Sequence, residues 1–229
     1  ETLKDTRKSL KTTSVGAIRL DIKSIRKATG EAEKNEAEDE LEHDIEDRKL
    51  ETQELKDRLD ILKREYEEKR KEAIADFAEK QKIFKEQLKL VKDEKKQATA
   101  ESINTRAAAI HDKGIEELKK SIERLTSTLE KAVAIANDRG ITSDALTTAI
   151  SQAKDAISAA QQVLNDEAGK QYVATITSET TLGASIKGII ADTRAGLGAV
   201  QKKIIVAKQE VMDVVQLVRT SSATPTPTP

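Results

Sequence analysis

Two histidines are the side chains of this 229-residue sequence best suited to metal binding or proton transfer. A Glu-x-x-His motif ends at His43, and this motif is half of the carboxylate pattern that holds two iron ions in helical bundles. The pattern needs a second copy, but Ala108 stands where the Glu before His111 would be. Asp39, His43 and Asp47 share a helical face, yet such acidic runs are usually solvated. We therefore expect neither a metal site nor a cofactor.

No other pattern in the sequence predicts an enzyme. The chain has no Cys, which excludes thiol catalysis, disulfides and Cys-ligated zinc. The Gly196-x-Gly198 pair lacks the third glycine and the preceding strand of a dinucleotide site. No nucleophile or acid–base partner accompanies His111 in the sequence, so we expect this residue to be exposed rather than a catalytic base. The prediction is a non-enzymatic protein.

Charge and aromatic content argue against nucleic acid and membrane partners. The 40 basic and 41 acidic residues leave a net charge of −1, and the densest basic run, 63–71, is interrupted by glutamates. Aromatic residues make up only 2% of the chain, too few to stack a run of bases. The longest stretch without charge is ten residues, whereas a membrane-spanning helix needs about 20 apolar ones. We expect protein partners and no membrane-spanning segment.

The elements that carry these residues are predicted to be long helices. Residues 31–113 contain neither Gly nor Pro, and their apolar residues fall mostly at spacings of three, four or seven. This spacing is typical of a coiled coil, with lysines interrupting the seam. Whether residues 31–138 form one helix or a bent pair stays open. The candidate interaction seam consists of Leu55, Leu59, Leu62, Tyr66, Phe77, Phe84 and Leu88.

The N-terminal region has an uneven charge distribution. Residues 1–30 carry eight basic and three acidic groups, whereas residues 31–47 carry one basic and ten acidic groups. We expect residues 1–28 to form a helix that folds back, antiparallel, on the acidic start of the arm. The narrow apolar seam of the arm still needs burial, so we also predict self-association into a homo-oligomer.

Downstream, three segments with cleaner heptads predict an antiparallel three-helix bundle. The first two are joined at Gly140, with Thr142 or Ser143 capping the second helix. Residues 169–177 are rich in β-branched residues and predict a short extended strap. The third segment contains four glycines, and glycines within a helix usually indicate that another part of the chain packs closely against the helix backbone. They are Gly183, Gly188, Gly196 and Gly198.

The predicted architecture is therefore all-α, in three parts. An N-terminal helix and a long charged coiled-coil arm occupy residues 1–101, the three-helix bundle residues 102–220, and a Thr/Pro-rich tail or linker residues 221–229. Such tails act as spacers or stalks and are sometimes O-glycosylated. The missing Cys fits an exported protein, either secreted or on the cell surface, whereas the start at Glu1 rather than Met leaves open whether a signal peptide was removed or the sequence is trimmed.

A longer motif resembles a known family. The stretch Glu167–Leu182 has the sequence Glu-Ala-Gly-Lys-Gln-Tyr-Val-Ala-Thr-Ile-Thr-Ser-Glu-Thr-Thr-Leu, preceded by the Gly140-Ile141-Thr142 turn and an Ala-rich segment. Together they are similar to uncharacterised, predicted-secreted helical coiled-coil proteins of candidate-phyla-radiation (Patescibacteria-type) bacteria. The resemblance covers roughly residues 90–220. It implies export and an all-α fold, and it implies no activity and no functional residues.

These observations lead to two expected functions. The first is a non-enzymatic extracytoplasmic structural or interaction protein, such as a surface spacer, scaffold or adhesin-like element, that acts through coiled-coil packing. The alternative is an extracytoplasmic holdase-type chaperone or adaptor that grips client chains between helical arms. The alternative requires exposed apolar surface at Tyr66, Phe77, Phe84 and Leu88.

Overall fold

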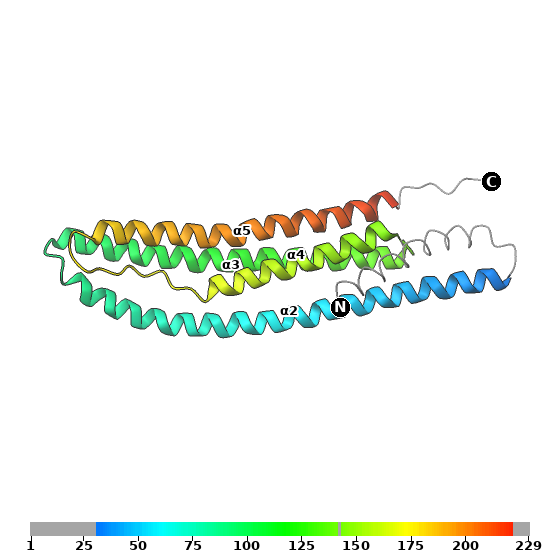
Figure 1. The fold of residues 1–229 in the computed structure, drawn as a ribbon, viewed down its shortest axis with the longest axis horizontal. Helices are drawn as coiled ribbons and strands as arrows, with labels where there is room; N and C mark the ends of the chain where they lie inside the picture. Colours follow the sequence, from blue (N-terminus) through cyan, green and yellow to red (C-terminus); the bar gives the residue numbers. More distant parts are fainter. Residues whose placement is uncertain (1–30, 142, 222–229) are drawn as a thin grey trace, which may run out of the picture. The chain divides into compact units, whose positions relative to one another are not determined.

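A computed structural model describes residues 31–141 and 143–221, apart from the side chains of residues 31–41, 44 and 51. The predicted fold-back of residues 1–28 and the Thr/Pro-rich residues 223–229 lie outside these described residues. The described chain consists of four helices, namely α2 (Glu31–Leu88), α3 (Glu94–Asp138), α4 (Asp144–Ala168) and α5 (Leu182–Ser221) (Figure 1). The all-α prediction is confirmed. None of these four helices is long and apolar enough to cross a membrane.

The chain divides into two compact units, each containing a part of every helix. Unit 1 comprises Glu1–Asp57, Leu125–Asp155 and Ala207–Pro229, and unit 2 comprises Arg58–Arg124 and Ala156–Val206. This grouping differs from the predicted division between residues 101 and 102. In unit 2, α2 is not an arm projecting from a bundle, because its apolar seam packs against other helices of the same chain.

In unit 2, α2 runs antiparallel to α3. The hydroxyl of Tyr66 donates to Glu116 at 2.8 Å, and the carboxylate of Glu101 lies 3.3 Å from the ammonium of Lys85. The residue numbers of the partners on α3 therefore decrease as the residue numbers on α2 increase, as they do in antiparallel helices. The apolar cluster of this unit joins residues of α2, α3, α5 and the connections between helices. It consists of Phe84, Leu88, Val91, Ala100, Ala107, Ala174, Ile176, Leu182, Ile186 and Ile189.

The turn between α2 and α3 answers the open question about residues 31–138, which form two helices. Asp93 ends the turn as the N-cap of α3, since its Oδ1 accepts the backbone N–H groups of Lys95 at 2.9 Å and Lys96 at 3.2 Å. Glu179, far along the chain, accepts the N–H of Lys92 at 3.1 Å. A side-chain cap and a long-range carboxylate therefore fix a bend that contains neither Gly nor Pro.

In unit 1, the predicted turn between α3 and α4 is confirmed. Gly140 has a φ of 59°, in the left-handed region that favours glycine, and Ile141 donates its N–H to Ala136 at 2.9 Å. The Ser143 hydroxyl accepts the N–H of Leu146 at 3.2 Å and so caps α4. The buried guanidinium of Arg48 on α2 donates to the carbonyl of Ile141 at 2.9 Å, which ties α2 to this turn.

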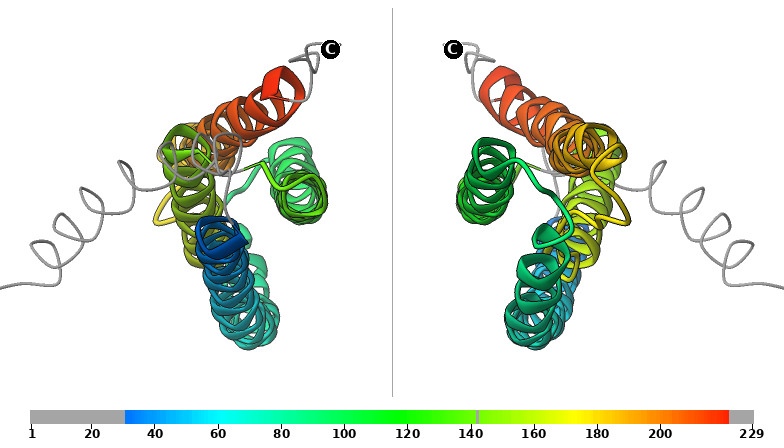
Figure 2. Two further views of the ribbon diagram at one scale, coloured as in Figure 1. Left: turned by 90° about the vertical axis from the view of Figure 1, so that its right-hand side faces the viewer. Right: turned by 90° about the vertical axis from the view of Figure 1, so that its left-hand side faces the viewer.

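The predicted strap connects α4 to α5 in unit 2. Residues 170–176 adopt neither helix nor strand. Figure 2 shows this segment, in yellow, leading into α5 near the turn between α2 and α3. The hydrogen bond from Lys92 to Glu179 joins the two connections. We call residues 170–176 the strap.

Candidate functional site

The chain itself covers most of the predicted interaction seam. Leu55, in unit 1, is buried, and Phe77, in unit 2, is partly buried. The other five seam residues lie in unit 2 and are 0–8% exposed, namely Leu59, Leu62, Tyr66, Phe84 and Leu88. The apolar surface that the holdase hypothesis requires is therefore largely buried, and the seam gives no physical reason to expect a second copy.

A buried polar cluster in unit 2 was not predicted. Its centre is Glu167 in the last turn of α4, which is 2% exposed. Its Oε1 accepts the hydroxyl of Tyr172 at 2.7 Å, and its Oε2 accepts the ammonium of Lys170 at 2.9 Å. The Nε2 atom of His111, on α3, lies 3.3 Å from Oε1. We call these four residues the Glu167 cluster, and together they fasten α3, the end of α4 and the start of the strap.

The prediction that His111 is exposed was wrong. Its side chain is 3% exposed, and the edge of its ring meets Tyr172 with a centroid separation of 5.1 Å. Its Nδ1 lies 3.7 Å from Asp112, which forms an ion pair of 2.6 Å with the Arg70 guanidinium of α2. Local sequence suggested an unpartnered residue, but His111 gains its partners from other helices and the strap.

The electrostatics of the cluster favour an ionised Glu167. Burial alone would raise the pKa of this carboxyl, but the close His111 imidazole and the hydrogen bonds from Tyr172 and Lys170 outweigh it and lower the pKa to about 2. Burial and the bond to Glu167 both raise the pKa of the Tyr172 hydroxyl, which therefore remains a donor. Both carboxylate oxygens accept from groups of the chain itself, so the arrangement is suited to fastening segments.

Gly196 on α5 is what lets the cluster lie against that helix. A Cβ atom at this position would fall 1.9 Å from Oε1 of Glu167 and 2.5 Å from the hydroxyl oxygen of Tyr172. The close approach predicted for the helical glycines is confirmed here. The prediction of close approach was wrong for Gly183, Gly188 and Gly198, where an added Cβ would meet nothing within 4 Å.

Beyond the cluster, two side-chain amides hold the backbone of the strap. Asn104 of α3 accepts the N–H of Ala174 at 3.0 Å, and Gln87 of α2 accepts the N–H of Ile176 at 2.8 Å. The hydroxyl of Ser185, on α5, donates to the carbonyl of Thr175 at 2.6 Å. Three helices of unit 2 thus bind the strap through side chains.

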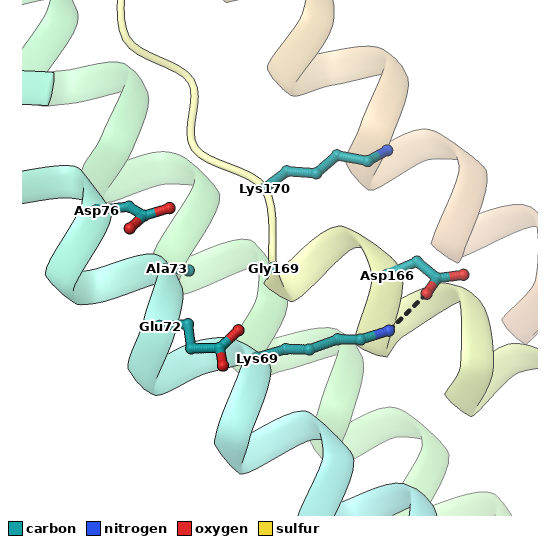
Figure 3. A pocket seen from close by; sticks show the side chains of 7 residues that line it. All are labelled: Lys69, Glu72, Ala73, Asp76, Asp166, Gly169 and Lys170. Atoms are coloured by element: carbon teal, nitrogen blue, oxygen red, sulfur yellow. Dashed lines mark hydrogen bonds and ion pairs between the residues drawn. The ribbon is translucent and has the colours of Figure 1, made fainter.

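Beside the cluster, a hollow of about 270 Å³ opens between α2 and the end of α4 (Figure 3). Its floor includes the buried Ala73. Lys69 crosses it and pairs with Asp166 and Glu65, each at 2.8 Å. These hydrogen bonds raise the pKa of Lys69, so its amine stays protonated and is a poor nucleophile. The full lining is Lys69, Glu72, Ala73, Asp76, Asp166, Gly169 and Lys170.

The candidate metal ligands near His43 face solvent. The side chains of His43 and Asp47 are 76% and 61% exposed and approach each other only to 4.0 Å. The side chain of Asp39 lies outside the described residues. Among the residues that the structure describes, no three His, Cys, Asp or Glu side chains form a group that could hold a metal ion.

Comparisons with family models, curated proteins and solved structures give no match. Sequence reasoning missed Glu167, Asn104 and Gln87 as fastening residues. The one available signal was that Glu167 directly precedes the predicted strap and Tyr172 lies near its start, where a helix end and an extended segment must be joined.

Proposed function

We propose that the chain is a non-enzymatic structural protein that works outside the cytoplasm, as a surface spacer, scaffold or adhesin-like element. The observation that supports this most is the burial of the α2 seam within one chain. In unit 2 the seam residues already have apolar partners on other helices, and inter-helix bonds such as Tyr66–Glu116 tie the pairs together. A unit closed in this way can keep fixed distances between groups on its surface.

We further propose that the helices pack as a coiled coil. The buried residues of α2 in unit 2 follow steps of three and four, as at Leu59, Leu62 and Tyr66. The buried amide of Asn165 on α4 donates to the carbonyl of Leu62 at 2.7 Å. A polar residue within an apolar seam specifies register, because any shift would leave it unpaired.

The proposed partners are proteins. Self-association through the seam would first have to uncover buried residues, so contacts with other chains should use exposed side chains. Single aliphatic residues such as Ile61 and Ile110, 65% and 61% exposed, are available for this.

Spin labels test the fixed geometry. Because the chain has no native Cys, Ile61→Cys and Lys82→Cys on α2 place two labels in unit 2 without further changes. Twenty-one helical residues correspond to about 32 Å between backbone sites. The proposal predicts a narrow distribution of distances between the two labels, near that value. The same labelled protein in denaturant is the control and should give a broad distribution. A broad distribution in the native protein would remove the mechanical basis of a spacer.

The proposed location needs its own test. It is supported by the missing Cys, the Thr/Pro-rich residues 223–229 and the family resemblance. An antibody against the folded chain should label intact source cells without permeabilisation. Labelling that appears only after permeabilisation would exclude the surface role but leave the spacer geometry intact.

A further inference from the structure

The strap has the pattern of a bound extended peptide. Ala174 and Ile176 are 3% and 1% exposed and belong to the apolar cluster of unit 2, whereas Thr175 and Thr177 are exposed. Tyr172 also reaches inward, since its hydroxyl donates to the buried Glu167, and Val173, between Tyr172 and Ala174, is partly buried against the same cluster. Side chains that alternate inward and outward are typical of an extended chain with one face buried.

The backbone of the strap is bound in a way that another peptide could reproduce. Its N–H groups at Ala174 and Ile176 are accepted by the side-chain amides of Asn104 and Gln87. These contacts recognise main-chain atoms, which every extended segment presents at the same spacing. If a second extended segment of similar pattern displaced the strap, its backbone would therefore form the same hydrogen bonds that the strap loses.

Asn104 supplies an independent sign of an incomplete fit. Its side chain is fully buried at 0% exposure, and its Oδ1 accepts from Ala174. Its Nδ2 has no hydrogen-bond partner among the described residues. An Asn amide can both accept an N–H and donate to a carbonyl, and buried donors are almost always paired. The strap uses only the acceptor half of this residue.

We propose that the groove of unit 2 lined by α2, α3 and α5 is a binding site for an extended peptide, and that the strap is its intramolecular occupant. The ligand is a polypeptide segment with an aromatic, a small and a β-branched aliphatic residue at alternating positions, as at Tyr172, Ala174 and Ile176. Such a ligand donates its backbone N–H groups to the side-chain oxygens of Gln87 and Asn104, as the strap does. This inference does not depend on the proposed spacer role.

A labelled synthetic peptide with the sequence of residues 170–178 is the probe, and the full chain is the receptor. Tyr172→Ala in the protein removes one of the two hydrogen bonds from the strap to Glu167, leaves that of Lys170, and should raise the fraction of molecules in which the groove is open. Because apparent affinity scales with that fraction, fluorescence polarisation should show binding at least about tenfold tighter than to the unmodified protein. If this variant does not melt cooperatively, Ser185→Ala, which removes a single strap contact, takes its place.

Matched controls separate groove binding from adhesion. A peptide with Ala174→Lys should not bind, because that position is buried in the apolar cluster. Asn104→Ala in the receptor should weaken binding of the original peptide. No saturable binding to a folded, strap-weakened protein, or equal binding of both peptides, overturns the proposal.

Discussion

At the scale of single residues, Glu167 organises the join between α4 and the strap. A carboxylate this buried is stable only when charge-assisted hydrogen bonds replace its lost hydration. Lys170 and Tyr172 of the strap donate such bonds, and His111 of α3 lies 3.3 Å from the same carboxylate. The fold around the strap therefore depends on the charge state of one side chain.

Acid should weaken the fold through Glu167. Its folded pKa, about 2, lies below the ordinary value of 4.5, so the stabilisation is complete above about 4.5 and is lost as the pH falls towards 2. Linkage sets an upper limit of about 3 kcal/mol for this contribution. Urea unfolding between pH 7 and pH 2.5 measures it. In Glu167→Gln the free energy of unfolding should fall less between pH 4.5 and pH 2.5 than in the unmodified protein. In Glu123→Gln, at an exposed position, it should fall as it does in the unmodified protein. The same loss of unfolding free energy at low pH in all three proteins would contradict a stabilising role of the ionised Glu167.

Two glycines of α5 provide a paired test of packing. Gly196→Ala would force a methyl group into the bond between Glu167 and Tyr172 and should cost about 1–3 kcal/mol, as overpacking does. Gly198→Ala meets nothing within 4 Å and should stabilise the helix by about 0.4–1 kcal/mol, because alanine has less backbone freedom to lose. Thermal melts compare the two variants. The same sign for both would mean that α5 does not touch the cluster.

At the scale of elements, the helix ends are fixed by caps rather than by breakers. α3 starts at a bend without Gly or Pro, where Asp93 satisfies two free N–H groups and Glu179 satisfies another. Lys96 donates to Glu179 at 2.8 Å, so the start of α3 is also tied to the end of the strap connection. The bend thus depends on groups close in space but distant in sequence.

Removing the cap should loosen this bend. Asp93→Ala leaves two backbone donors of α3 without their acceptor and should lower the free energy of unfolding by about 1 kcal/mol. Asp93→Asn serves as the control, because asparagine caps about as well as aspartate. Hydrogen exchange at Lys95 and Lys96 should accelerate in the alanine variant only. Unchanged exchange there would show that the cap does not hold the bend.

The sequence predicted what depends on local pattern. The helical periodicity, the Gly140 turn and the Ser143 cap follow from residues within one or two turns of each other, and they were confirmed. The position of the break between α2 and α3 near Asp93 could not be predicted, because residues 31–113 contain neither Gly nor Pro. The burial of His111 also escaped prediction, since its partner Glu167 lies on another helix. Sequence spacing alone does not bring those two side chains together.

At the scale of the whole molecule, one chain supplies both sides of its own seam. Each compact unit draws segments from all four helices, so residues far apart in sequence must meet before either unit is complete. The seam was expected to need a second copy, but in unit 2 the apolar cluster satisfies Phe84 and Leu88 internally. In the described part of unit 2, these two seam residues therefore have almost no exposed apolar surface left for a second copy to cover.

The oligomeric state should follow from that closure. Sedimentation equilibrium over a hundredfold range of protein concentration should give the monomer mass throughout, because association would not bury the seam further. Phe84→Ala, which opens a cavity in the cluster, should destabilise the chain by about 3–5 kcal/mol without creating a stable dimer. A mass that rises with concentration in the unmodified protein would restore self-association as the mechanism.

Cross-linking tests most directly whether α2 packs on its own chain. Lys85 and Glu101 are exposed and form an ion pair of 3.3 Å between α2 and α3. With Lys85→Cys and Glu101→Cys in one chain, a short bis-maleimide should give a cross-linked product at the monomer position on a denaturing gel. An equimolar mixture of the two single-cysteine variants should give no heterodimer beyond the level seen with a Glu68→Cys and Glu101→Cys mixture. A dominant dimer from the Lys85→Cys and Glu101→Cys mixture would contradict a seam closed within one chain.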